Sequence, residues 1–212
     1  MTTIAVIDYG MGNLRSVSKA LEHVAPSAAV TVTSNPEIVG RADRVVFPGQ
    51  GAMPDCMREM DRFGLRGVIR DAAAQKPFLG ICIGLQMLFD RSEEGDIEGL
   101  GIFRGTVRRF PETSMHLADG SRLKVPHMGW NQVSQRMNHP LWAGIDDATR
   151  FYFVHSYYAD PCDRACIAGE TGYGVPFTAA VARDNIFAVQ FHPEKSHAHG
   201  LRLLANFVAW KP

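Results

Sequence analysis

The residue best placed to act as a nucleophile is Cys82, at the centre of the sequence Gly-Ile-Cys-Ile-Gly at positions 80–84. The apolar run 78–81 before it predicts a strand, and helical spacing follows it. A nucleophile between a strand and a helix, flanked by glycines, is typical of the nucleophile elbow. The glycines allow close passage of the chain, and the helix N-terminus favours the thiolate. The alternative is a structural cysteine buried in a glycine-rich turn.

A base for that thiol is offered by His192, which follows the apolar run 186–190 and precedes Pro193 and Glu194. The proline stiffens the backbone between the two side chains. A carboxylate two residues from an imidazole can reach its far nitrogen, fix the tautomer and stabilise the imidazolium. Taken alone, the pair also fits a solvated loop histidine beside a surface glutamate.

Two further histidines, His197 and His199, follow His192 and raise the question of a metal site. No cysteine or paired carboxylate stands at ligand spacing beside them. We therefore expect no metal ion and no cofactor.

The sequence Pro-Gly-Gln-Gly at positions 48–51 follows another apolar run, 45–47. Gly49 and Gly51, on either side of Gln50, leave backbone N–H groups uncovered and able to point at an oxyanion, which is worth a few kcal/mol to a tetrahedral intermediate. By itself the sequence also suits an ordinary Pro-Gly turn. All three candidate features lie at the carboxyl ends of predicted strands, the edge where doubly wound sheets carry their sites.

The elements that must position these residues alternate in the first ninety residues. Strands are predicted at 4–7, 29–33, 45–47 and 78–81, and helices at 14–24, from 36 onward, at 53–62, at 65–74 and from 83 through 89. Asn13 and Asn35 are the expected caps of the first two helices. This alternation predicts a parallel sheet with helices on both faces.

The second half predicts strands at 107–110, 132–133, 151–154, 166–168, 178–181 and 186–190, and a last helix near 201–208. Short turns separate these strands. We therefore expect an α/β fold with a mixed, mostly parallel sheet flanked by helices and extended by antiparallel strands, in one domain spanning 1–212.

Composition narrows the class of protein. The 212 residues are 46% hydrophobic and 21% charged, and 22 basic residues balance 22 acidic ones. Zero net charge argues against bulk attraction to nucleic acid, and the hydrophobic content argues against disorder. No apolar run approaches the ~20 residues of a membrane span, and the N-terminus lacks a signal pattern. Four scattered cysteines read as reduced thiols, so we expect a cytoplasmic protein that binds neither nucleic acid nor membrane.

Together, the Gly-Ile-Cys-Ile-Gly-Leu-Gln sequence at 80–86 and Phe-His-Pro-Glu at 191–194 closely resemble the class I (triad) glutamine amidotransferases. The resemblance extends from residue 4 to residue 207. It implies that Cys82 attacks the side-chain amide of glutamine, His192 moves the proton, and Glu194 orients His192. The resulting thioester is hydrolysed, giving glutamate and ammonia.

The same resemblance implies how glutamine is held. Gln86 would help to bind the substrate, and the segment carrying Ser156 and Tyr157 would grip its α-amino and α-carboxylate groups. Gly49 and Gly51 fit the oxyanion loop of the family. Gln50 departs from it, because a small apolar residue is expected there.

Residues 8–14, 126–131 and 190–196 resemble the branch of the family that serves histidine biosynthesis. This implies, as partner, a (β/α)8-barrel cyclase subunit, which uses the ammonia to make imidazole glycerol phosphate and an aminoimidazole carboxamide ribonucleotide. The expected interface residues are Asn13, Trp130, Tyr152 and Lys195, with a tryptophan anchor and a lysine able to pair with a partner acid. Their alternatives are a core tryptophan and a solvated lysine.

Three other functions stay open at this point. One is a glutaminase of another pathway, such as pyridoxal phosphate synthesis, and another is a stand-alone cysteine hydrolase or peptidase with the same elbow. The third is a binding module that kept the fold without the chemistry.

Overall fold

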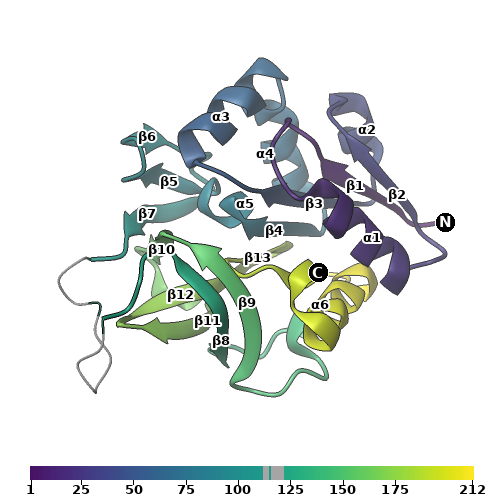
Figure 1. Ribbon diagram of the computed structural model, residues 1–212. Coiled ribbons are helices and arrows are strands. Elements are labelled where there is room, and N and C mark those ends of the chain that lie inside the picture. The colour runs from purple at the N-terminus through teal and green to yellow at the C-terminus, as the bar shows by residue number, and fades with distance from the viewer. Residues whose placement is uncertain (112–114, 116–121) are drawn as a thin grey trace.

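The computed structural model describes residues 1–111, 115 and 122–212. Its centre is a parallel sheet in the order β2-β1-β3-β4-β13 (Figure 1). These strands are β1 (Thr3–Ile7), β2 (Ala29–Thr33), β3 (Arg44–Gly49), β4 (Phe78–Cys82) and β13 (Ile186–Val189). β3, β4 and β13 are buried along their whole lengths, which explains their continuous apolar runs.

Helices cover both faces of this sheet, with α1 and α6 together on one face and α2, α3 and α4 on the other (Figure 1). They are α1 (Leu14–Val24), α2 (Pro36–Arg41), α3 (Met53–Arg62), α4 (Arg66–Gln75), the short α5 (Ile83–Gln86) and α6 (His197–Ala209). In α1, Val17 and Leu21 are buried, as the helical spacing predicts.

Beyond β13 the sheet continues with antiparallel strands in the order β12-β10-β7, followed by β5 and β6. A second arm runs from β12 through β11 and β8 to β9, in the lower front of Figure 1. The strands are β5 (Phe89–Ser92), β6 (Ile97–Glu98), β7 (Phe103–Arg109), β8 (His127–Gln135), β9 (Thr149–His155), β10 (Tyr157–Pro161), β11 (Ile167–Tyr173) and β12 (Val175–Arg183). Short 3-10 turns lie at η1 (Pro140–Trp142), η2 (Arg164–Cys166) and η3 (Pro193–Lys195). The expected fold class, a helix-flanked parallel sheet extended by antiparallel strands, is confirmed.

Two local expectations are wrong. The helix after Cys82 ends at Gln86 instead of continuing through Phe89, because Phe89 begins β5 and its ring stacks on Phe103 of β7 at 5.7 Å. The side chain of Asn13 makes no cap hydrogen bond, although the residue precedes α1. Asn35 does cap α2, because its side chain accepts from the Glu37 N–H at 2.8 Å.

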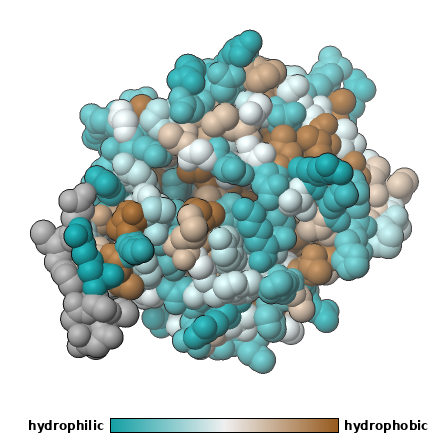
Figure 2. Space-filling view, viewed as in Figure 1, coloured by the Kyte–Doolittle hydropathy of each residue, from teal (hydrophilic) through white to brown (hydrophobic). Residues whose placement is uncertain are grey.

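The face drawn in Figure 2 carries its hydrophobic residues as separate patches among hydrophilic ones. Within the described part of the chain, no helix is long and apolar enough to cross a membrane.

Candidate active site

The elbow places Cys82 at the junction of β4 and α5 in a backbone conformation that few side chains adopt. Its φ is 57° and its ψ −110°, outside the favoured regions for a residue with a Cβ. Gly84 passes so close to β3 that an added Cβ would run into the carbonyl oxygen of Phe47. This close approach explains why the position requires glycine, and it fixes the cysteine at the carboxyl edge of the sheet.

His192 and Glu194 form a buried pair on the segment that follows β13. The Nδ1 of His192 is 2.9 Å from Oε1 of Glu194, and the two side chains are only 4% and 1% exposed. The other ring nitrogen, Nε2, has no hydrogen-bond partner among the described residues. A solvated loop histidine is thereby excluded, since this ring is buried, oriented by a carboxylate and left with one free nitrogen.

Charges around His192 determine its protonation. Burial by itself lowers the imidazole pKa, but the Cys82 sulfur and the Glu194 carboxylate outweigh burial and raise the pKa to about 10. The imidazolium is therefore the dominant form of His192 at neutral pH. A cysteine paired with an imidazolium is ready to act as a nucleophile.

The glycine loop lies directly beside the cysteine, because Gly49 at the end of β3 is in register with Cys82 on β4. An added Cβ on Gly49 would lie 2.6 Å from the Tyr9 hydroxyl and 2.7 Å from the Ile83 Cβ. The Tyr9 hydroxyl donates to the carbonyl of Pro48 at 2.8 Å, holding the loop from below. Gly51 has a φ of +104°, which glycine adopts without strain.

A cavity of about 310 Å³ opens at this edge and brings the predicted residues together. The expected catalytic, loop and substrate residues that line it are Gln50, Gly51, Cys82, Gln86, Ser156, Tyr157 and His192. Glu194 lies behind His192 and does not line the cavity. Cys82 and His192 are 110 positions apart in the chain. Both line this cavity because β4, which ends at Cys82, and β13, which precedes His192, are adjacent parallel strands.

Two polar residues of this site were not among the residues singled out from sequence. Gln190 is fully buried, accepts from Nε2 of Gln86 at 3.0 Å and donates to the Cys82 sulfur at 3.7 Å. Glu94 lines the cavity and accepts the backbone N–H of Met53 at 2.8 Å, at the start of α3. The sequence signals for Gln190 are its place at the end of an apolar run, two positions before His192, and at the start of the stretch 190–196 that resembles the family.

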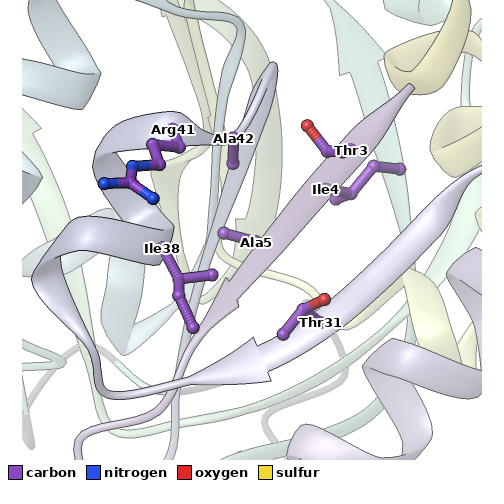
Figure 3. A pocket seen from close by; sticks show the side chains of 7 residues that line it. All are labelled: Thr3, Ile4, Ala5, Thr31, Ile38, Arg41 and Ala42. Atoms are coloured by element: carbon purple, nitrogen blue, oxygen red, sulfur yellow. The ribbon is translucent and has the colours of Figure 1, made fainter. Parts of the chain in front are cut away.

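A smaller cavity of about 170 Å³ lies elsewhere, between β1, β2 and α2, and it carries no comparable chemistry (Figure 3). Its lining is mostly aliphatic and threonine side chains toward the amino end of β1. Its one charged residue, Arg41, is exposed and pairs with Glu37 at 3.7 Å. The cavity at Cys82 is therefore the candidate active site.

Three of the four expected interface residues form a cluster, and one of them, Lys195, lines this cavity. The Lys195 ammonium lies 6.0 Å from the centre of the Tyr152 ring, and the Tyr152 ring lies 6.0 Å from that of Trp130. Trp130 is 41% exposed, stacks on His197 at 5.0 Å and has the more exposed Met128 nearby on β8. Asn13 lies apart from this cluster in the chain, at the start of α1, a helix that contacts η3. Trp130 is thus on the surface, and not in the core.

Metal binding finds no support in the geometry of the described residues, which bring no three His, Cys, Asp or Glu side chains close enough to hold an ion. The expectation of no metal ion stays a prediction.

An elbow cysteine, a buried His-Glu pair and a glycine loop at the carboxyl edge of a parallel sheet are the features of a glutamine amidotransferase. The family model for glutamine amidotransferase class-I matches residues 5–210. The chain belongs to this family of enzymes.

Relatives narrow the family further. The chain is 68% identical to the imidazole glycerol phosphate synthase subunit HisH of Nitrosospira multiformis and 67% identical to that of Aromatoleum aromaticum, over the full length of each. Among solved structures, PurLQS from Thermotoga maritima aligns with a TM-score of 0.72 at 17% identity, covering 98% of both chains. A glutamine amidotransferase from the same organism aligns at 0.62 over 91% of this chain and 76% of its own, with 16% identity. At these identities the structural matches support the fold alone.

Proposed function

We propose that the chain is the glutaminase subunit of an imidazole glycerol phosphate synthase and that Cys82, His192 and Glu194 are its catalytic triad. The observation that carries the proposal is the buried His192–Glu194 pair, whose imidazole lines the same cavity as the strained Cys82. We also propose that residues 1–212 act as one amidotransferase domain. The names and full-length matches of the HisH relatives favour histidine biosynthesis over pyridoxal phosphate synthesis.

In the first half of the reaction, the Cys82 thiolate attacks the side-chain amide carbon of glutamine. Backbone N–H groups of the loop at Gly49, Gln50 and Gly51 stabilise the oxyanion. The His192 imidazolium then gives its proton to the leaving nitrogen, the C–N bond breaks, and ammonia departs. A γ-glutamyl thioester remains on Cys82.

In the second half, neutral His192 takes a proton from water as the water oxygen attacks the thioester carbonyl. The C–S bond breaks, glutamate leaves, and Cys82 returns as a thiolate beside the imidazolium. Glu194 keeps its charge throughout, holding Nδ1 and stabilising the positive ring.

Recognition of glutamine is assigned to polar groups around the cavity. Oε1 of Gln86 is a buried acceptor without a hydrogen-bond partner among the described residues, and the carboxylate of Glu94 faces the same cavity. We assign these two acceptors to the α-ammonium of glutamine. Ser156 and Tyr157, at the β9–β10 junction, would hold its α-carboxylate.

The proposed partner is a (β/α)8-barrel cyclase subunit docked over the cluster of Trp130, Tyr152 and Lys195, the last of which lines the cavity. Support comes from the exposed aromatic surface beside the cavity and from the relatives' description as synthase subunits. Docking there would enclose the cavity, so that ammonia reaches the cyclase without becoming ammonium in bulk water.

The experiment is to measure glutamate release by the chain alone, with the cyclase subunit, and with the cyclase plus its nucleotide ligand. We expect low activity alone and a rise in kcat/KM at each step. Equal kcat/KM in all three would refute partner dependence. Faster cleavage of γ-glutamyl peptides than of glutamine would favour a stand-alone hydrolase instead.

A further inference from the structure

Two buried histidines, His127 and His155, form a pair beside the candidate active site and have no part in the mechanism above. His127 begins β8 and His155 ends β9, and the two residues are in register across the hairpin. Nδ1 of His127 is 3.0 Å from Nε2 of His155, and the residues are 3% and 6% exposed. His155 lines the glutamine cavity, yet both of its ring nitrogens are already engaged.

Hydrogen bonds fix which nitrogen of each ring carries the proton. Nδ1 of His155 is 2.8 Å from the carbonyl of Tyr157, which can only accept, so this nitrogen is the donor. Nε2 of a neutral His155 must then accept, and His127 donates to it from Nδ1. Nε2 of His127 is left as an acceptor, 3.4 Å from the amide nitrogen of Asn131. That amide also donates to the carbonyl of Gly172 at 2.9 Å.

Burial among aromatic side chains keeps both rings uncharged. The His127 ring stacks between Tyr173 and Phe153, with centroid separations of 4.0 Å and 4.9 Å. Burial lowers the pKa of His127 to about 4 and that of His155 to about 3. The two rings are therefore neutral, whereas His192 is charged. With their tautomers fixed, they form a rigid connection from His127 through His155 to the Tyr157 carbonyl.

The rigid connection ends on an atom of the glutamine site. The carbonyl of Tyr157 accepts from His155 and also from Nε2 of Gln86 at 2.9 Å. Gln86 gives its second amide proton to Gln190, which contacts the Cys82 sulfur. The orientation of this carbonyl therefore sets where Gln86 presents its free oxygen to the substrate.

We propose that His127 is a positioning residue for glutamine binding, acting through the ring of His155 to hold the Tyr157 carbonyl and, with it, Gln86. This inference rests on the proposed function, because it concerns the same substrate site. His127 touches neither the substrate nor the reacting atoms. The groups that His127 positions bind the α-carbon end of glutamine, which is unchanged between ground state and transition state. Loss of His127 therefore raises KM and leaves kcat unchanged.

The test replaces His127 in the complex with the ligand-bound cyclase subunit. His127→Phe keeps the stacked ring and removes both nitrogens, whereas His127→Asn keeps a donor near the position of Nδ1. We expect KM for glutamine to rise about tenfold in His127→Phe with kcat within about twofold. His127→Asn should keep KM within about threefold of wild type.

The matched control is Tyr173→Phe, which preserves the stack on His127 and removes only the hydroxyl that donates to Lys124. Its KM should equal that of wild type. A general loosening of the aromatic cluster would raise KM in both His127 variants and in the control, and that result overturns the proposal. Unchanged KM in His127→Phe also overturns it. An inactive wild-type complex would instead refute the proposed function.

A second measurement does not depend on any variant folding. The 15N chemical shifts of the wild-type histidine rings report their tautomers directly. We expect the proton on Nδ1 in both His127 and His155, and a proton on Nε2 of His155 would overturn the inference.

Discussion

Replacing Glu194 with glutamine separates orientation of the base from the base itself. Oε1 of Glu194 is 2.9 Å from Nδ1 of His192, and the glutamate side chain is 1% exposed. Glutamine preserves the shape and one acceptor but removes the charge. A hydrogen bond to a charged group contributes about 1.5–3 kcal/mol, and the loss is felt where the imidazolium must be stabilised. At about 1.4 kcal/mol per decade, kcat/KM should fall about 10- to 150-fold.

His192→Ala removes the proton-transfer group altogether, and its loss should be larger, at least about 10⁴-fold. Glutamate release is measured over several pH values in the presence of saturating cyclase. Because Glu194 helps to raise the His192 pKa, the alkaline limb of the profile should move to lower pH in Glu194→Gln. The matched control is Glu37→Gln, an exposed change on α2. A greater loss in Glu194→Gln than in His192→Ala would refute this division of roles.

Three further outcomes are expected. Gly84→Ala should destabilise the fold by about 1–3 kcal/mol in urea unfolding, because the added Cβ would run into the Phe47 carbonyl. Gly172→Ala, with open space around the added Cβ, should leave the stability unchanged. Equal stability of the two variants would contradict the close approach of Gly84 to β3. Burial lowers the pKa of His139 to about 4, so the unfolded state binds the extra proton and stability falls as pH drops from 6.5 to 4. His139→Asn should reduce the pH dependence of the free energy of unfolding over this range by up to about 1.4 kcal/mol per pH unit. An unchanged pH dependence would show that other groups cause it. Trp130→Ala should weaken cyclase binding about 30-fold in a titration, while the affinity for a glutamine analogue stays constant. Undiminished cyclase binding would show that Trp130 is not part of the interface.

The parallel part of the fold was predictable because a strand buried on both faces is a continuous apolar run. β1, β3, β4 and β13 all show that pattern, whereas the short strand β5 has two exposed residues in the middle. Its one apolar residue, Phe89, lies four positions after Leu85 of α5, a spacing that suits a helix equally well. Tertiary pairing with β7 decides for a strand, and local sequence does not contain that information.

The site was predictable where a residue has a side chain that can itself act as a nucleophile or a base. Cys82 and His192 stand out by their type and by the glycines and proline around them. Gln190 and Glu94 do not, since a lone polar residue at a strand end has many ordinary uses. Only the sheet order brings Gln190 to a sulfur 108 residues away. The tautomers of His127 and His155 likewise depend on a register that the sequence leaves open.

Covalent labelling of Cys82 tests the proposed glutaminase chemistry most directly. A glutamine analogue with an electrophilic carbon in place of the amide is incubated with the cyclase complex, and the adduct is located by mass spectrometry. We predict one adduct, on Cys82, that excess glutamine prevents. Cys162, the exposed thiol, serves as the internal control and should react with a simple alkylating agent but not with the analogue. An adduct on Cys56, Cys162 or Cys166 in place of Cys82 would contradict the account.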